Sequence, residues 1–305
     1  MKNKGVLYAL CAGISWGISL GIFGRTMTSF GFTAMQVSAV RTTISAITFI
    51  ILALVTDRKA FRLSPKDIWI FLCSGFISVT LFCWCYFTST RLCSLAVGGV
   101  LQYTAPVWVV VFSAVIFKEP ITKVKAAAMA IAIAGCVLVS GITHGVGQVS
   151  AFGLVAGVFS GITYGSYTIF TRFAVPKYRT MTINVYTFIV ASATSLLLSG
   201  PVKTVSAVCI PKVLPVAIIG GIMCAAVPYY FYNKSLETLE NGKASILATI
   251  EPVIAVMVSV FYYKEPLSVE ALIGIALILG AVVILAIQKD GVPAKAEHQE
   301  VQAAK

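Results

Sequence analysis

Uninterrupted apolar runs of about 20 residues recur along the whole chain, and they limit the possible folds more than any other feature. A helix of that length rises about 30 Å, which is enough to cross the hydrocarbon layer of a bilayer. Hydrophobic residues make up 58% of the chain and charged residues 11%, more apolar surface than a soluble core can bury. Continuous rather than alternating runs favour helices over a barrel. The sequence therefore predicts an all-α integral membrane protein.

Ten of these runs are expected to span the membrane: residues 5–24, 33–55, 67–89, 94–117, 122–141, 151–171, 181–199, 212–235, 243–262 and 268–287. The Lys and Arg residues orient them, because short cytoplasmic loops are enriched in basic side chains. With a cytoplasmic N-terminus, 17 of the 23 Lys and Arg lie inside, 5 lie outside, and Arg41 lies within the second span. Both termini are therefore expected to be cytoplasmic, in a multi-pass protein of the plasma or inner membrane. The net charge of +12 is accounted for by these loops and does not indicate nucleic-acid binding.

The chain contains an internal repeat. Lys-Glu-Pro occurs at residues 118–120 and again 146 positions later, and an ungapped alignment at that offset matches ten of the 41 residues in 101–141. Near the start of each half, GISWG at 13–17 parallels GITYG at 161–165. The two halves, residues 1–143 and 144–288, hold five predicted spans each and are followed by a polar tail, 289–305, that is expected to be disordered. Since five is odd, the second half is expected to be inverted, an arrangement typical of secondary transporters.

The positions of these motifs resemble those of a known family. Trp-Gly near the start of each half, a proline in each fourth span and an acidic-Pro turn before each fifth span are similar to the EamA-type ten-helix transporters of the drug/metabolite transporter superfamily. The resemblance covers residues 5–287. It implies secondary transport, often export, of amino acids, related metabolites or drugs, and it does not indicate a particular substrate.

Arg41 and Glu251 lie deep inside predicted spans. Each is about eight residues from one end of its span, roughly 12 Å below the surface of the membrane. A charge at this depth is costly unless it is paired or faces a cavity. Arg41 is expected either to bind a substrate carboxylate or to be a structural cation bonded to helix-end carbonyls or a carboxylate.

Glu251 has three open interpretations. It could exchange a proton and so couple transport to a proton gradient, it could bind an ammonium group of the substrate, or it could pair with Arg41 or bond to a nearby backbone. If both residues bind substrate, a zwitterion fits them together.

Proline residues interrupt three predicted spans. Pro106 and Pro252 occupy matching positions in the two halves, and paired interruptions of this kind indicate a transporter binding site. Gln102 and Tyr103 precede Pro106 and are expected to contribute to substrate binding, because their polar side chains need partners there. Each proline could also be only a packing kink.

Aromatic residues gather in the third and eighth spans. Those expected to line the substrate path are Trp84 and Tyr86 in the third span, and Tyr229 and Tyr230, which follow Pro228 in the eighth. Trp16 and Tyr164 match across the repeat and could also face the cavity. The alternative is an interfacial belt, or simple packing beside the neighbouring glycines.

The charged triplets are interpreted as turns. Their residues are Lys118, Glu119 and Pro120 in the first half and Lys264, Glu265 and Pro266 in the second. Proline suits the first turn of the following helix, and a glutamate before it suits the positive helix end. The two triplets are expected on opposite sides of the membrane, so they cannot share one site.

No P-loop, HExxH, GxSxG or paired-carboxylate motif is present, so the chain is not expected to be an enzyme. The cysteines lie mostly inside apolar runs without metal-ligand spacing, so neither a metal nor a cofactor is expected. The expected partners are the lipid bilayer, a small-molecule substrate and protons. A monomer can suffice for the cavity, and the sequence leaves the oligomeric state open.

The sequence therefore predicts a secondary active transporter that exports small polar metabolites such as amino acids, by alternating access around a cavity near the bilayer midplane. One alternative is an uncoupled facilitator or importer. Another is a membrane scaffold or sensor that transports nothing, although the inverted repeat and two deeply placed charges argue against it.

Overall fold

The computed structural model describes residues 2–93, 95–140, 142, 150–264 and 266–287. Within these ranges the chain forms helices and no strand. Glu265, the junction of the two halves at residues 143 and 144, and the tail 289–305 lie outside the described residues.

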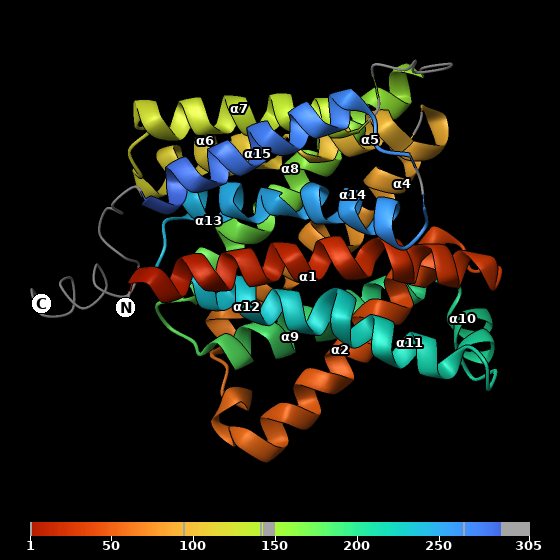
Figure 1. The fold of residues 1–305 in the computed structure, drawn as a ribbon. Helices are drawn as coiled ribbons and strands as arrows, with labels where there is room; N and C mark the ends of the chain where they lie inside the picture. Colours follow the sequence, from red (N-terminus) through yellow and green to blue (C-terminus); the bar gives the residue numbers. More distant parts are fainter. Residues whose placement is uncertain (1, 94, 141, 143–149, 265, 288–305) are drawn as a thin grey trace, which may run out of the picture.

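The described part of the first half contains seven α-helices: α1 (Lys2–Ser29), α2 (Ala34–Thr56), α3 (Ile68–Leu72), α4 (Phe82–Leu92), α5 (Leu95–Gln102), α6 (Ala105–Phe117) and α7 (Lys123–Val139). The second half contains eight: α8 (Ala151–Ala174), α9 (Thr180–Ser199), α10 (Pro201–Val208), α11 (Leu214–Gly221), α12 (Val227–Leu236), α13 (Asn241–Leu247), α14 (Glu251–Phe261) and α15 (Val269–Ile287). They form one bundle, in which α1 begins and α15 ends at the same end (Figure 1).

Eight helical stretches of the described chain are long and apolar enough to cross a membrane: Lys4–Ser29, Ala34–Thr56, Pro65–Leu92, Val97–Phe117, Thr180–Ser199, Leu214–Leu236, Asn241–Phe261 and Val269–Ile287. The expected fifth and sixth spans correspond to α7, with 17 residues, and α8, with 24. Both lie within the same bundle (Figure 1).

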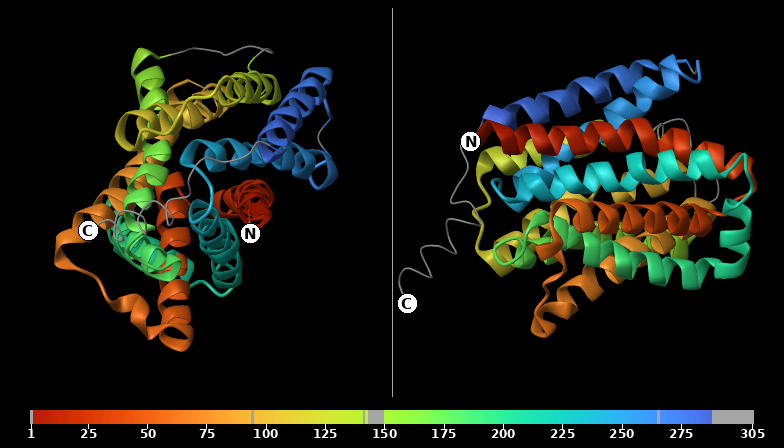
Figure 2. Two further views of the ribbon diagram at one scale, coloured as in Figure 1. Left: turned by 90° about the vertical axis from the view of Figure 1, so that its left-hand side faces the viewer. Right: turned by 90° about the horizontal axis from the view of Figure 1, so that it is seen from below.

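Equivalent helices of the two halves pack on one another. Viewed along the bundle, α2 and α9 lie on one side, and α7 and α15 lie on the other (Figure 2). Hydroxyl pairs join α2 to α9, including Thr43 with Ser192 and Thr42 with Ser195, each at 2.8 Å. Because lipid provides no hydrophobic force between helices, small residues and such hydrogen bonds hold membrane bundles together.

The third span of each half passes through a π-helical segment, Cys73–Leu81 in one and Ile222–Ala226 in the other. Gly75 and Gly221 occupy matching positions in these spans. A Cβ at Gly75 would lie 2.6 Å from Cβ of Val190 on α9, and one at Gly221 would lie 2.5 Å from Cβ of Ile44 on α2. The third span of each half therefore packs closely on the second span of the other half.

The fourth span of each half is broken in its middle. Helix α5 ends at Gln102 and α6 begins at Ala105, while a 3₁₀ turn, Ala248–Ile250, separates α13 from α14. Pro106 and Pro252 each lie in the first turn of the helix that follows, where a missing N–H costs no intrahelical bond. The two breaks fall at matching positions of the repeat.

Residues 118–120, and the described residues Lys264 and Pro266 of the second triplet, lie between helices, but the structure differs from the expectation for the prolines. Helix α7 begins three residues after Pro120, and Thr122 caps it by accepting from the backbone N–H of Lys125 at 3.1 Å. Helix α15 likewise begins three residues after Pro266. Lys118 and Lys264 have positive φ values of 55° and 60°. The left-handed lysine turns the chain sharply at the end of each preceding helix, so the proline lies in the connection and not in the next helix.

Candidate functional site

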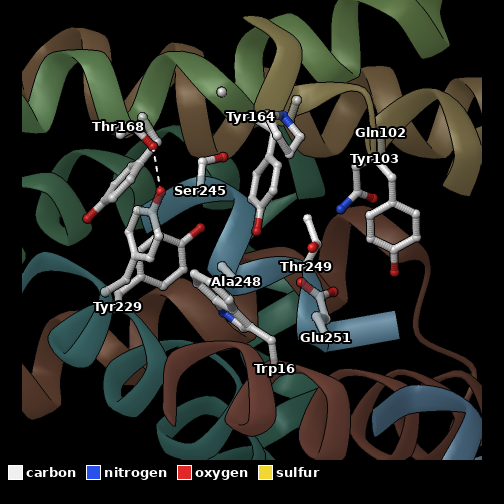
Figure 3. Close-up of a pocket in the computed structure, with 15 residues that line it drawn as sticks. Trp16, Gln102, Tyr103, Tyr164, Thr168, Tyr229, Ser245, Ala248, Thr249 and Glu251 are labelled. Atoms are coloured by element: carbon white, nitrogen blue, oxygen red, sulfur yellow. Dashed lines mark hydrogen bonds between the residues drawn. The ribbon is translucent and has the colours of Figure 1, made fainter. Parts of the chain in front are cut away.

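A cavity of about 40 Å³ lies between the two helix breaks (Figure 3). The first break contributes Gln102, Tyr103, Ala105 and Pro106, and the second contributes Ser245, Ala248, Thr249 and Glu251. The remaining lining residues are Trp16 from α1, Tyr164, Gly165, Tyr167 and Thr168 from α8, and Tyr229 and Tyr232 from α12. Residues far apart in the sequence and from both halves therefore meet at one place.

Helices α1 and α8 hold the breaks in position. A Cβ at Gly17 of α1 would lie 2.6 Å from the carbonyl oxygen of Glu251, and one at Gly165 of α8 would lie 3.0 Å from that of Ala105. Ala105 and Glu251 are 146 positions apart, so the same contact occurs in both halves. The first helix of each half packs on the broken helix of the other, and this close approach leaves no room for a larger residue at Gly17 and little at Gly165.

Six of the fifteen residues that line the cavity are aromatic. The ring of Trp16 lies edge-on to Tyr229, with centroids 5.2 Å apart, and to Tyr164 at 6.5 Å. Tyr167 meets Tyr229 at 4.9 Å. The hydroxyl of Tyr232 bonds with that of Thr168 at 2.8 Å, which is the dashed line in Figure 3. These three ring pairs meet edge to face, one of the arrangements that aromatic pairs prefer.

Glu251 is the acidic residue of the lining and is 9% exposed. Figure 3 shows its carboxyl group on the same side of the cavity as Thr249, with the side chains of Tyr164 and Gln102 directed toward it. In the part of the chain that the structure describes, Glu251 has no ion pair and no side-chain hydrogen bond. A buried carboxylate without a partner is costly, so this position suits a group that takes up either a proton or a cation.

Arg41 lies outside the lining of the cavity. It is buried, at 8% exposure, and donates from Nη2 to Sγ of Cys83 at 3.2 Å, while Ser38 donates to the same sulfur at 3.1 Å. The described residues contain no ion pair between Arg41 and Glu251. The two charges therefore make no direct contact, although the charge of Arg41 still acts on the Glu251 carboxyl group through space.

Some of the other predicted site residues line the cavity, and others lie away from it. Trp84 is 44% exposed and is not among the residues that line the cavity. The rings of Tyr86 and Tyr230 pack against Phe87 and Phe231, at 5.4 and 5.9 Å, and neither lines the cavity. Pro228 lies in the first turn of α12, one residue before Tyr229, and is buried. Of the aromatic residues expected on the path, Trp16, Tyr103, Tyr164 and Tyr229 reach the lining.

Several lining residues were not singled out from the sequence. Tyr167 and Thr168 follow Tyr164 by three and four positions, so they lie on the same face of α8. Ser245 and Thr249 are likewise four positions apart near the second break. Helical spacing from Tyr164 would have identified the first pair, but small hydroxyl residues in a span carry no distinctive signal of their own.

A second group of charged residues closes one end of the bundle. Lys125 and Glu240 form a buried ion pair at 2.6 Å. Glu119 accepts from the backbone N–H of Asn241 at 3.2 Å and lies 4.0 Å from Arg172. Burial raises the pKa of Glu119, although the Asn241 N–H and the charges of Arg172 and Lys125 counteract this effect. The sequence interpretation of Glu119 as a helix-end residue missed these contacts, because they come from α8 and α13.

Comparison with known proteins identifies the family to which this chain is similar. The model of the EamA-like transporter family matches this chain twice, over residues 3–141 and 151–287. An uncharacterized transporter of Archaeoglobus fulgidus is 28% identical over 202 residues, covering 65% of this chain and 70% of the relative. The uncharacterized transporter YetK of Bacillus subtilis is 22% identical over 310 residues, covering 97% and 92%.

A solved structure, described only as a crystal structure of a protein, has a TM-score of 0.75 at 18% identity and covers 92% of this chain and 95% of its own, which is a likeness of fold. The two family matches confirm the repeat and the recognition made from the sequence motifs. The matched family consists of transporters, and the apolar helices place the chain in the cell membrane as a multi-pass protein. The chain belongs to the EamA-like transporter family, within the drug/metabolite transporter superfamily.

Proposed function

We propose that this chain is a secondary active transporter of small polar metabolites that works by alternating access around the cavity between the two helix breaks. The observation that carries the proposal is the matched pair of breaks, each packed on the first helix of the opposite half. In transporters built from repeats, the substrate binds near the membrane midplane where such interrupted helices meet. The lining supplies polar and aromatic groups at this depth.

The proposed topology has ten spans in two inverted halves, residues 1–143 and 144–288, with both termini in the cytoplasm. Adding α7 and α8 to the eight apolar stretches gives ten. The start of α1 and the end of α15 lie at the same end of the bundle, whereas α8 begins at the opposite end (Figure 1), which supports inversion. The excess of Lys and Arg supports the cytoplasmic assignment of that first end.

The structure corresponds best to a state that is closed toward the cytoplasm. The buried pair of Lys125 and Glu240 and the contacts of Glu119 lie at the end of the bundle assigned to the cytoplasm, and they tie the α6–α7 turn to α8 and α13. The cavity itself has room for a few water molecules. Because a metabolite is larger than this space, the lining side chains and the closing contacts must move before a metabolite can bind.

Glu251 is the proposed coupling residue. It can bind either a proton or a cationic substrate, and exchange of one for the other would drive export against a substrate gradient when protons enter the cell. A facilitator or importer without coupling would use the same cavity. A proton-coupled exporter and an uncoupled transporter differ in whether a pH gradient can drive the substrate against its concentration gradient.

The test is counterflow with the purified full-length protein in liposomes. The liposomes are loaded with one unlabelled amine, amino acid or organic acid at a time, and the same labelled solute is added outside. Transient accumulation of label, absent from protein-free liposomes, is the expected result for at least one class. No accumulation with any of the three classes would contradict the proposed function.

A further inference from the structure

The charges around the cavity are unbalanced. Of the described residues that line it, one is acidic and none is Lys, Arg or His. The other polar groups are neutral: the Gln102 amide, the hydroxyls of Ser245, Thr168 and Thr249, and the tyrosine phenols. A ligand that enters therefore meets a single negative group.

No described residue makes an ion pair or a side-chain hydrogen bond with Glu251, and Arg41 acts on it only through space. Arg41, the cation expected from the sequence, is bonded to Cys83 and forms no ion pair with Glu251. Lys125, another buried cation, pairs with Glu240 at the end of the bundle. Since a carboxylate without a directly bound partner is disfavoured in a membrane interior, a cation that enters the cavity can form the direct ion pair with Glu251 that Arg41 does not form.

The aromatic walls favour the same kind of ligand. Six rings line the cavity, those of Trp16 and of the tyrosines at 103, 164, 167, 229 and 232. The Trp16 ring contacts three of these tyrosine rings, with ring centroids between 5.2 and 6.5 Å apart. The faces of Trp and Tyr rings attract ammonium groups, and they do so more strongly where water is excluded.

A carboxylate on the ligand would find no counterpart in the cavity. It would lie in the same apolar space as Glu251, with no lining cation to neutralise it. The amine of a zwitterion could approach Glu251, but its carboxylate would remain buried and unpaired. The cavity therefore distinguishes solutes by the presence of a carboxylate.

We propose that the cavity selects organic cations of the amine class that lack a carboxylate, in preference to amino acids and organic anions. In this assignment the ammonium group lies against Glu251 and the rings cover the rest of the ligand. The inference rests on the proposed function, because it takes the cavity as the transport site. It replaces the zwitterion that the sequence favoured, since that expectation needed Arg41 in the same site.

The test uses amino acids and their decarboxylated counterparts, which share one side-chain skeleton. Phenethylamine is compared with phenylalanine, isopentylamine with leucine, and 3-phenylpropionate serves as the anion. Binding to the purified protein is measured by ligand-induced thermal stabilisation, and exchange by counterflow in liposomes. The expected result is that each amine binds at least about tenfold more tightly than its amino acid and exchanges faster.

The variant Glu251→Gln is expected to lose the preference for amines. Its control is Asp57→Asn, which removes a carboxylate at the end of α2 that pairs with Arg179 at 2.8 Å and lies away from the cavity. This control should keep the preference.

Amino acids or 3-phenylpropionate that exchange while both amines are inert would overturn the inference and leave the proposed transport function standing. An amine preference that persists in Glu251→Gln would overturn it as well. Absence of exchange by every solute of the panel would contradict the transport function itself.

Discussion

Trp16 and Tyr164 meet edge to face at the centre of the molecule, with ring centroids 6.5 Å apart. The two residues occupy matching positions in GISWG and GITYG, and each is flanked by glycines that pack on a broken helix of the other half. The contact therefore joins the two repeats at the cavity. The glycines beside these rings pack on the helix breaks, so they are positions where an added side chain would disturb the cavity.

Gly17→Ala is expected to destabilise the protein by about 1–3 kcal/mol, the range for overpacking a filled site. The added Cβ would lie 2.6 Å from both the carbonyl oxygen of Glu251 and Cβ of Ile254, and neither atom belongs to a flexible chain end. The break before α14 would have to shift, so exchange activity should fall as well. Thermal unfolding in detergent and counterflow in liposomes measure the two effects.

Gly21→Ala is the matched control, four residues further along the same helix. A Cβ there would have no heavy-atom neighbour within 4 Å. Alanine also has the better helix propensity, so this variant should be neutral or slightly stabilising. Equal destabilisation by the two variants would show that close packing on the break is not the cause.

The sequence revealed the repeat because identical residues recur at a constant offset, and the prolines located both helix breaks. It also identified Glu251, Gln102 and Tyr103, because polar residues in an apolar run are easy to recognise. It could not distinguish Arg41 from a cavity residue. Depth in the membrane follows from the position in a helix, whereas the direction of a side chain depends on how that helix is rotated against its neighbours.

The charged group at Glu119 shows the same limit. The sequence places Glu119 in a turn, which is correct, but its contacts with Asn241 and Arg172 join segments more than 50 residues apart. No local sequence pattern predicts contacts between such distant segments. Similarly, the left-handed conformation of Lys118 is set by the sharp turn after α6 and is uncommon for lysine, so propensity alone does not predict it.

The affinity for phenethylamine is expected to fall as the pH is lowered, because protons and the amine compete for Glu251. The decrease should approach at most tenfold per pH unit, the limit for one competing proton. Tyrosines, the other ionisable residues of the lining, stay neutral at pH 5–8. Binding isotherms at several pH values test this, with Glu251→Gln expected to be weak and independent of pH. A pH dependence of equal slope in the variant would exclude Glu251 as the competing site.

Removing one partner of the Lys125 and Glu240 pair is expected to cost far more stability than removing one partner of an exposed pair of similar length, because the remaining charge is left buried. Its N–O distance is 2.6 Å with side chains 4% and 10% exposed, whereas Lys177 and Asp67 lie 2.7 Å apart with Lys177 46% exposed. Removing one partner of a buried pair costs about 3–5 kcal/mol, and exposed pairs contribute about 0.2–1 kcal/mol.

Double-mutant cycles measure both pairs in the same protein. The first uses Lys125→Met and Glu240→Gln, and the second uses Lys177→Met and Asp67→Asn, each followed by thermal unfolding. The coupling energy of the buried pair should exceed that of the exposed pair. Coupling energies that agree within about 0.5 kcal/mol, the usual limit of additivity, would contradict this.

The stability of the Glu119→Gln variant, relative to that of the wild type, is expected to increase as the pH rises. Burial raises the pKa of Glu119 above its ordinary value of 4.5, so the folded protein holds this proton more tightly than the unfolded chain does. The resulting stability is fully present below pH 4.5 and is lost as the pH rises through the raised pKa. Glutamine has the same shape and cannot ionise, so the variant escapes this loss.

Thermal unfolding of both proteins between pH 4 and pH 8 measures this difference. The melting temperature of the variant minus that of the wild type should increase across the range, with the charges of Arg172, Lys125 and Glu240 left in place. A difference that decreases with rising pH would mean that Arg172 and the Asn241 N–H stabilise the ionised carboxylate more than burial disfavours it. The turn would then be held closed by an ion pair, and its opening would be favoured by acid instead of by base.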